Sequence, residues 1–171
     1  MGLFDFLKKP AAPAKPEPVS AAYAAGVVCA PVSGDAIQLS ESADPVFASE
    51  AMGKGIAINP SGEVAYAPVS GTVSAAMAHA VGMVADDGAE VLVHVGIDTV
   101  EMNGNGLTCL VSQGDHVEAG QPIVSFSKSK IAAAGKSDTV FTVITNSDDY
   151  TVEPVANGPV TAGSVVVKLT K

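Results

Sequence analysis

Residues 91–99, "VLVHVGIDT", decide the fold. Three valines in this segment alternate with Leu92 and His94, which is the period of a strand buried on one face. The valines therefore predict a ridge that faces a core. Leu92 and His94 are predicted to lie on the opposite face of the strand.

Residues 77–90, "MAHAVGMVADDGAE", predict the neighbouring strand, because several of their apolar side chains fall at alternate positions. The Asp87-Gly88 pair between the two segments is a strong signal of a two-residue hairpin turn. We take this turn as the one that sets the register of the hairpin.

The two-residue turn brings two histidines together. His94 then lies opposite Val81, and His79 lies opposite Gly96 on the same face. Diagonal cross-strand neighbours have side chains about 7 Å apart at their bases, a separation that two leaning imidazole rings can close. A three-residue loop would instead turn one histidine to the other face.

The composition predicts a single all-β domain. With 171 residues, 47% hydrophobic content and a mean hydropathy of +0.34, the chain can bury one substantial core. It has eleven prolines, seventeen glycines and short Val/Ile/Ala runs with little helical period. These features favour an antiparallel β-sandwich or barrel-like domain with few short helical turns.

The charge argues against a nucleic-acid partner. The formal net charge is −9 and all nine basic residues are lysines, so neither a basic stripe nor an arginine fork is present. The acidity would suit a basic protein partner. Cys29 and Cys109 lie singly in apolar runs and predict buried reduced thiols. The N-terminus lacks a secretory apolar core, which predicts a cytoplasmic chain.

The chain is predicted to divide into a tail, a linker and a domain. Residues 1–9, "MGLFDFLKK", predict an amphipathic tail that either dips into the headgroups at the inner face of the membrane or is frayed. Residues 10–25 are rich in alanine and proline and predict an extended linker. Residues 26–171 are the predicted folded domain.

Two repeats predict an internal duplication. The segments "CAPVSGDAIQL" from Cys29 and "YAPVSGTVSAA" from Tyr66 share the core "APVSG". A weaker pair is "GDHVEAGQPIVSF" from Gly114 and "ANGPVTAGSVVVKL" from Ala156. Duplicated β-units predict two similar halves packed face to face.

Local patterns predict further short elements. Strands are expected around residues 46–47 and 55–59, and closing strands within 137–145 and 163–171. Residues 127–140 form the only later stretch that suits a short helix.

Two neighbouring histidines allow three chemistries. A hydrolytic zinc site needs a third protein ligand; Asp98 and Glu101 are candidates, but no His-x-His or His-Glu-x-x-His spacing occurs. Nucleophilic hydrolysis needs an activated serine or cysteine, and no nucleophile-elbow sequence supports it. Covalent phosphoryl transfer through a neutral imidazole needs neither a nucleotide site nor magnesium, and no P-loop is present.

Three segments of the chain resemble one family. "LVHVGIDTVEMNGNGL", "AHAVGM" and "GKGIAINPSGEVAYAPVSGTV" closely resemble the glucose-family enzyme IIA domain of the bacterial sugar phosphotransferase system, over about residues 26–171. The segment "MGLFDFLKK" also resembles the membrane-associating tail of some stand-alone members.

The resemblance implies an antiparallel β-sandwich phosphocarrier. It would take phosphate from the histidine-containing carrier protein and pass it to a cysteine on the IIB domain of a sugar permease. His94 would be the acceptor through Nε2, and His79 the supporting histidine. No cofactor is obligatory, although in some relatives a zinc ion bridges the two histidines and a carboxylate of a partner.

The resemblance also implies a partner-docking face around the histidines. Asp44 and Asp98 match its flanking acids. The family often carries phenylalanine at four nearby positions, here Ala75, Val81, Leu92 and Val95, and threonine where Met77 stands, so a flatter docking face is expected. The docking and flanking residues implied are Phe47, Asp44, Val81, Leu92, Val95, Asp98, Val100 and Glu101.

Two other interpretations of the function stay open. The chain could be a regulatory binding module whose phosphorylation adds about two negative charges to an apolar patch and so switches its partners. It could also be a zinc peptidase-like protein, against which the missing third histidine argues. The sugar remains open among glucose, N-acetylglucosamine and β-glucosides, and so does the existence of regulatory targets.

Overall fold

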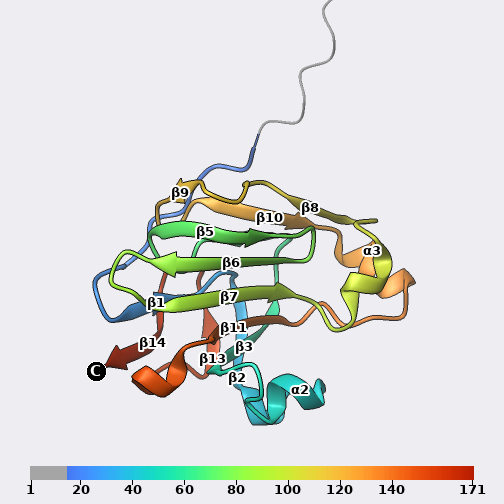
Figure 1. The fold of residues 1–171 in the computed structure, drawn as a ribbon. Helices are drawn as coiled ribbons and strands as arrows, with labels where there is room; N and C mark the ends of the chain where they lie inside the picture. The colour runs from blue at the N-terminus through green and yellow to red at the C-terminus, as the bar shows by residue number, and fades with distance from the viewer. Residues whose placement is uncertain (1–14) are drawn as a thin grey trace, which may run out of the picture.

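The computed structural model describes residues 15–171 and folds most of them into β-strands (Figure 1). The predicted tail of residues 1–9 lies outside the described residues. The short helices are α2 (Pro45–Ala48) and α3 (Lys128–Ala133), with 3-10 turns η1 (Leu39–Glu41), η2 (Thr99–Met102) and η3 (Ser147–Asp149). The strands are β1 (Val27–Cys29), β2 (Gly34–Gln38), β3 (Lys54–Pro60), β4 (Val64–Tyr66), β5 (Gly71–Ala76), β6 (Ala80–Ala85), β7 (Glu90–Val95), β8 (Leu107–Cys109), β9 (His116–Val117), β10 (Pro122–Phe126), β11 (Val140–Ile144), β12 (Thr151–Pro154), β13 (Gly158–Val160) and β14 (Val165–Thr170).

The strands form three antiparallel sheets. The large sheet has the order β13-β2-β3-β11-β7-β6-β5-β9, and two three-stranded sheets have the orders β1-β14-β12 and β4-β10-β8. Strands β5, β6 and β7 lie side by side across the front of Figure 1, and α2 lies at the lower edge. Buried valines, isoleucines and alanines from all three sheets form the main core. The predicted all-β antiparallel fold is confirmed. Among the helices that the structure describes, none is long and apolar enough to cross a membrane.

The sequence repeats correspond to equivalent strands. The two "APVSG" copies lead from β1 into β2 and from β4 into β5, and the weaker pair forms β9 with β10 and β13 with β14. At the two edges of the large sheet β13 pairs with β2 and β9 pairs with β5. The halves meet along β7 and β11, where Val93 pairs with Thr142. They are therefore joined edge to edge by one sheet, a connection that the repeats alone did not predict.

The hairpin between β6 and β7 has a three-residue loop, so the predicted two-residue turn is wrong. The N–H of Ala85 donates to the carbonyl of Ala89 at 2.8 Å, which leaves Asp86, Asp87 and Gly88 as the loop. Gly88 takes a φ of 98°, the left-handed conformation typical of the last residue in such a loop.

The longer loop moves the register by one residue. Val81 pairs with Val93, and His94 pairs with Ala80 and not with Val81. Val81 and Met83 thereby face the core and are 0% and 1% exposed. The predicted register would have turned both of these apolar side chains outward, so burial favours the observed one.

Residues 45–48 form a helical turn where a short strand was predicted around 46–47. Oδ1 of Asp44 accepts hydrogen bonds from the N–H groups of Val46 and Phe47, at 2.8 and 3.3 Å, and Pro45 occupies the first turn. A carboxylate N-cap followed by proline favours the start of a helix. These signals outweigh the strand preference of valine and phenylalanine.

The end of the predicted linker is bound to the domain. The N–H of Val19 donates to the carbonyl of Gly120, and the N–H of Ala22 to the carbonyl of Gly163, both at 2.9 Å. Gly120 and Gly163 occupy the same position in the weaker repeat. Residues 19–22, here called the strap, are therefore held by one turn from each half, and they belong to the fold.

Thr142 carries a hydroxyl group into the main core. Its side chain is 0% exposed, between Ile56 and Val93 on the neighbouring strands. Among the described residues the hydroxyl has no hydrogen-bond partner. A buried polar group without a partner costs about 1–3 kcal/mol, so Thr142 destabilises the native state.

We expect Thr142→Val to raise the free energy of unfolding by about 1 kcal/mol, because the methyl group fills the same space without a desolvation cost. Urea unfolding at neutral pH measures it. Thr139→Val is the matched control and should lower stability, since the Thr139 hydroxyl donates to Oδ1 of Asn59 at 2.8 Å. A less stable Thr142→Val protein would contradict the assignment and indicate a bonded internal water.

Candidate active site

His94 lies on the face of the large sheet opposite the main core. The three valines of β7 are buried, whereas Leu92 and His94 are half-buried, as the alternation predicts. On β11, Phe141 lies directly beside His94. His94 is thus on a central strand, where neighbouring strands fix its backbone on both sides.

His79 reaches the same face from a turn. Met77 and Ala80 exchange backbone hydrogen bonds of 2.8 and 3.4 Å, so Ala78 and His79 form a two-residue turn between β5 and β6. The turn removes His79 from the strand alternation that would have pointed it into the core. The two histidines are neighbours, as predicted, but because of this turn and not because of the predicted register.

The imidazole of His94 is enclosed by three rings. The rings of Phe47 and Phe141 are stacked, with centroids 4.1 Å apart and planes inclined by 10°. The centroid of His94 lies 5.2 Å from that of Phe47. The ring of His79 meets His94 nearly edge-on, with centroids 5.1 Å apart and an interplanar angle of 78°. Helix α2 supplies Phe47, so the Asp44 cap also helps to build this wall.

Both histidines are biased toward the neutral form. Burial lowers the pKa of His79. Burial also lowers the pKa of His94, and the neighbouring His79 lowers it further, while the Gly96 backbone, Asp44 and Asp98 oppose the shift. A neutral imidazole has a free nitrogen lone pair at neutral pH and is a competent nucleophile.

The two nitrogens of His94 have different surroundings. Nδ1 is buried and has no well-formed hydrogen bond among the described residues, although the backbone of Gly96 lies close enough to favour a proton on the ring. Nε2 is not buried in this way. Chemistry with an outside molecule is therefore expected at Nε2.

The lowered pKa of His94 predicts a pH-dependent stability. The unfolded chain binds the proton near the ordinary pKa of 6.5, whereas the folded chain binds it only at lower pH. Stability rises with pH where the unfolded state holds more protons, so it should fall as pH drops below 6.5 through the lowered pKa. Urea unfolding at pH 7.5, 6.5 and 5.5 measures this. His94→Gln should lose less stability over that interval, and equal losses would contradict the prediction.

Several predicted docking residues are in the core. Val81 and Val95 are 0% exposed, so they cannot touch a partner, and their assignment to the docking face is wrong. Phe47 is 5% exposed and forms the wall behind His94 more than a surface. The one-residue register error explains Val81. Val95 belongs to the valine ridge, which the alternation had already assigned to the core.

Other predicted residues do lie at the surface. Asp98 and Val100 are exposed and Leu92 is partly exposed. Glu101 is exposed and accepts a hydrogen bond from Lys136 Nζ at 2.6 Å. Asp44 is 9% exposed, because its carboxylate caps α2.

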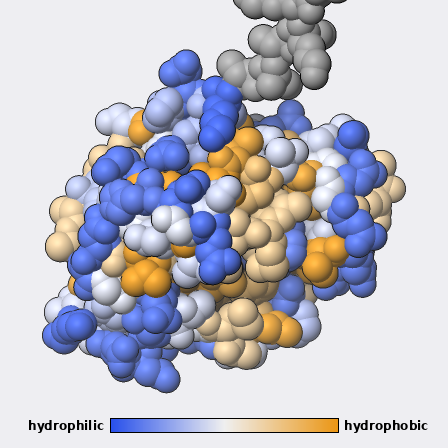
Figure 2. Space-filling view, turned by 45° about the horizontal axis from the view of Figure 1, so that its top comes forward, coloured by the Kyte–Doolittle hydropathy of each residue, from blue (hydrophilic) through white to orange (hydrophobic). Residues whose placement is uncertain are grey.

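Sequence reasoning missed two contributors, Phe141 and Val46, whereas it had named Met77. Phe141 could have been found from the alternation within residues 137–145, but nothing in the sequence aligned it with His94. Val46 and Met77 are exposed apolar side chains next to Phe47 and the His79 turn. On the face shown in Figure 2, apolar groups gather in a band bordered by hydrophilic ones.

Within the described part of the chain, the candidate site offers a metal ion one ring nitrogen from each of His79 and His94 and no third ligand. Among residues 15–171 no group of three or more His, Cys, Asp or Glu side chains is arranged to hold one. The donor set does not fit a zinc peptidase site with three protein ligands. A zinc ion between His79 and His94 would need a ligand from another molecule.

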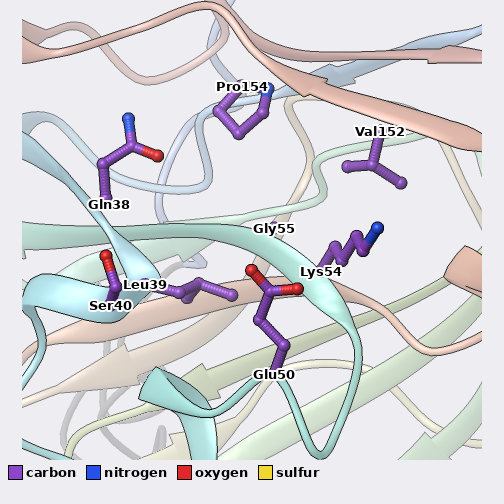
Figure 3. A pocket seen from close by; sticks show the side chains of 8 residues that line it. All are labelled: Gln38, Leu39, Ser40, Glu50, Lys54, Gly55, Val152 and Pro154. Carbon is purple, nitrogen blue, oxygen red and sulfur yellow. The ribbon is translucent and has the colours of Figure 1, made fainter.

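The duplicated half lacks the imidazoles. The two halves can be aligned on the central pair of Val93 on β7 and Thr142 on β11. In this alignment Val143 on β11 corresponds to His94 on β7, and Lys54 on β3 corresponds to His79. This lysine is exposed and lines a pocket of about 270 Å³ (Figure 3), and its amine points away from Glu50. The pocket is lined by Gln38, Leu39, Ser40, Glu50, Lys54, Gly55, Val152 and Pro154. Only one half of the duplicated fold therefore carries the candidate site.

A family model and known relatives match the chain. The model described as phosphoenolpyruvate-dependent sugar phosphotransferase system, EIIA 1, matches residues 26–150. The glucose-specific EIIA component of Staphylococcus aureus (strain COL) is 41% identical over 123 residues, which are 71% of this chain and 74% of that protein. In the solved structure of glucose permease IIA from Mycoplasma capricolum, the match has 38% identity and a TM-score of 0.78, covering 82% of this chain and 93% of the other.

Longer relatives contain the same segment. A β-glucoside-specific EIIBCA component from Dickeya chrysanthemi is 47% identical over 142 residues, or 81% of this chain. An N-acetylglucosamine-specific EIICBA component from Klebsiella pneumoniae is 40% identical over 157 residues, or 90% of this chain. The match spans only 22% and 24% of these two proteins.

Proposed function

Because the chain belongs to the EIIA 1 family of the phosphoenolpyruvate-dependent sugar phosphotransferase system, we propose that it carries a phosphoryl group on His94 between two partner proteins. The observation that supports this most is the enclosed imidazole of His94, with a second imidazole 5.1 Å away, centroid to centroid; burial lowers the pKa of His94 and so favours the neutral form. The glucose-type fold and the absence of a nucleotide motif agree with it.

The proposed first step is an in-line transfer between two histidines. Nε2 of His94 forms a bond to phosphorus while the N–P bond of the donor's phosphohistidine breaks, and that electron pair returns to the donor ring. The transition state for such a transfer is loose, so positioning and charge stabilisation provide most of the catalysis. The rings of Phe47 and Phe141 restrict the His94 ring and keep water from one of its sides.

His79 has the position of a supporting group. Its ring meets His94 edge-on, so an N–H of His79 can donate to a phosphoryl oxygen once His94 is phosphorylated. Its neutral form fits this role, because a neutral imidazole offers both one donor and one acceptor. In the second transfer, a cysteine thiolate of the IIB domain would form an S–P bond in line with the Nε2–P bond, which breaks and returns its electron pair to the His94 ring.

The proposed partners are the histidine-containing carrier protein as donor and a IIB domain as acceptor. The names of two relatives join an A component to B and C components in one chain, which supports a IIB partner. The net charge of −9 favours a basic donor surface. The exposed side chains of Val46, Met77 and Val100 offer apolar contacts near the histidines. Contact of residues 1–9 with the inner face of the membrane stays a prediction.

A two-stage assay tests this function. The chain is incubated with phosphoenolpyruvate, enzyme I and the carrier protein, and its intact mass is measured. One acid-labile phosphate per chain is expected. The phosphorylated chain is then mixed with membranes that contain a IIB domain and with glucose, N-acetylglucosamine or a β-glucoside. Loss of phosphate with formation of one sugar phosphate would identify the sugar.

Failure has a clear meaning in each stage. No phosphate on the chain despite a phosphorylated donor would overturn the carrier function and leave the binding-module alternative. Phosphate that forms but reaches no IIB domain would overturn transport while keeping the phosphohistidine. Chelator added to a mixture of the chain and carrier protein that is already phosphorylated shows whether a metal ion contributes to this transfer.

A further inference from the structure

The loop after His94 is closed by Thr99. Gly96 has a φ of 82°, and a Cβ atom added there would lie 2.2 Å from Cγ2 of Thr99. Thr99 is 0% exposed, and its hydroxyl donates a hydrogen bond to the carbonyl of Val95. The side chain therefore occupies the space that the missing side chain of Gly96 leaves, and it fixes the peptide between Val95 and Gly96.

The carbonyl of Gly96, which belongs to the next peptide group, is the link to His94. The backbone of Gly96 acts on the His94 ring in favour of a proton, and Nδ1 is the ring nitrogen that is buried without a well-formed hydrogen bond. On its other side the loop is anchored to the segment before β11. There the N–H of Gly96 donates to Thr139 at 2.8 Å, and that of Ile97 to Ser137 at 3.0 Å.

Val95 connects this loop to the second histidine. Its N–H donates to the carbonyl of His79 at 2.7 Å, and its carbonyl accepts from Thr99. Val95 therefore bonds to the His79 turn through its N–H and to the Thr99 hydroxyl through its carbonyl. Thr99 touches neither ring in these contacts, so any effect on the chemistry must act through the backbone.

We propose that Thr99 is a positioning residue that sets the tautomer of His94. By fixing the conformation of Gly96, whose carbonyl can accept from Nδ1, it keeps the proton on Nδ1 and leaves the Nε2 lone pair free. Which ring nitrogen carries the proton is set by the partner of the other nitrogen. For reactivity the inference rests on the proposed function, in which the Nε2–P bond forms as the donor's N–P bond breaks and Nδ1 keeps its proton throughout.

The test compares three variants by ¹⁵N NMR of the imidazoles in the unphosphorylated chain at pH 8. The wild type should show His94 protonated at Nδ1. Thr99→Val keeps the shape but removes the hydroxyl, and it should shift His94 toward the other tautomer and slow phosphorylation by the carrier protein about tenfold or more. Thr99→Ser keeps the hydroxyl and should restore both. If Thr99→Val does not fold, Thr99→Ala is measured in its place.

The control separates positioning from general loss of stability. Val166→Ala removes two methyl groups from a 0% exposed site on β14, in a different sheet from His94. It should lower stability but leave the His94 tautomer unchanged. An unaltered His94 spectrum in Thr99→Val, or an equal change in Val166→Ala, would overturn the inference. A wild type that accepts no phosphate would overturn the proposed function, while the tautomer measurement would still decide the role of Thr99.

Discussion

Replacement of His94 by alanine is expected to reduce phosphorylation of the chain to background. The change removes the nitrogen lone pair that forms the bond to phosphorus. His79 cannot replace it, because it lies on a turn and lacks the stacked rings of Phe47 and Phe141 that enclose His94. Intact-mass measurement after incubation with phosphoenolpyruvate, enzyme I and the carrier protein gives the result directly.

The third histidine provides the control for this experiment. His116 lies exposed on β9, and its Nε2 is 3.1 Å from Oδ1 of Asp86. His116→Ala should take up phosphate like the wild type. A His94→Ala chain that still carries one acid-labile phosphate, mapped to His79, would show that the two roles are exchanged.

Replacement of His79 by alanine is expected to separate the two transfers. His94 should still accept phosphate, whereas transfer onward to the IIB domain should fall by about 100-fold or more, the usual cost of losing one donor to a developing charge. The fold should survive, because Val95 bonds to the backbone carbonyl of His79 and the variant retains that carbonyl. Rapid-mixing kinetics with phosphorylated chain and IIB domain measure the second transfer.

A glutamine at position 79 refines this prediction. His79→Gln keeps an N–H donor of similar reach but cannot transfer a proton near neutral pH. If it restores most of the onward rate, hydrogen-bond donation is the function of His79. If it behaves like alanine, proton transfer is required. Full onward transfer by His79→Ala would remove His79 from the mechanism.

The face of β7 could be predicted from sequence, but the register of its hairpin could not. The three alternating valines must face the core, because exposing them to water costs more free energy than exposing Leu92 and His94. The register depends on whether Gly88 ends a three-residue loop or lies inside a two-residue turn, and Asp87-Gly88 suits both. The alternation on the partner strand was the better guide, because it requires Val81 and Met83 to face the valines.

The sequence predicted the two histidines of the site but not the aromatic rings that pack around His94. The wall behind His94 needs Phe47 and Phe141, which are far apart in sequence and meet only after α2 and β11 are placed. The signal for α2 was present in Asp44 and Pro45, an N-cap followed by a helix-starting proline. Long-range alignment of Phe141 with His94 depends on strand order, which local patterns do not contain.

The strap has a mechanical consequence for the tail that precedes it. A pull on that tail reaches the hydrogen bonds of Val19 and Ala22 before it reaches β1. The bond from Val19 to Gly120 is loaded first and the bond from Ala22 to Gly163 next, and β7 with its histidine lies outside the direct line of force. A force applied on the N-terminal side is therefore expected to be met first at the strap and not at the strand that carries His94.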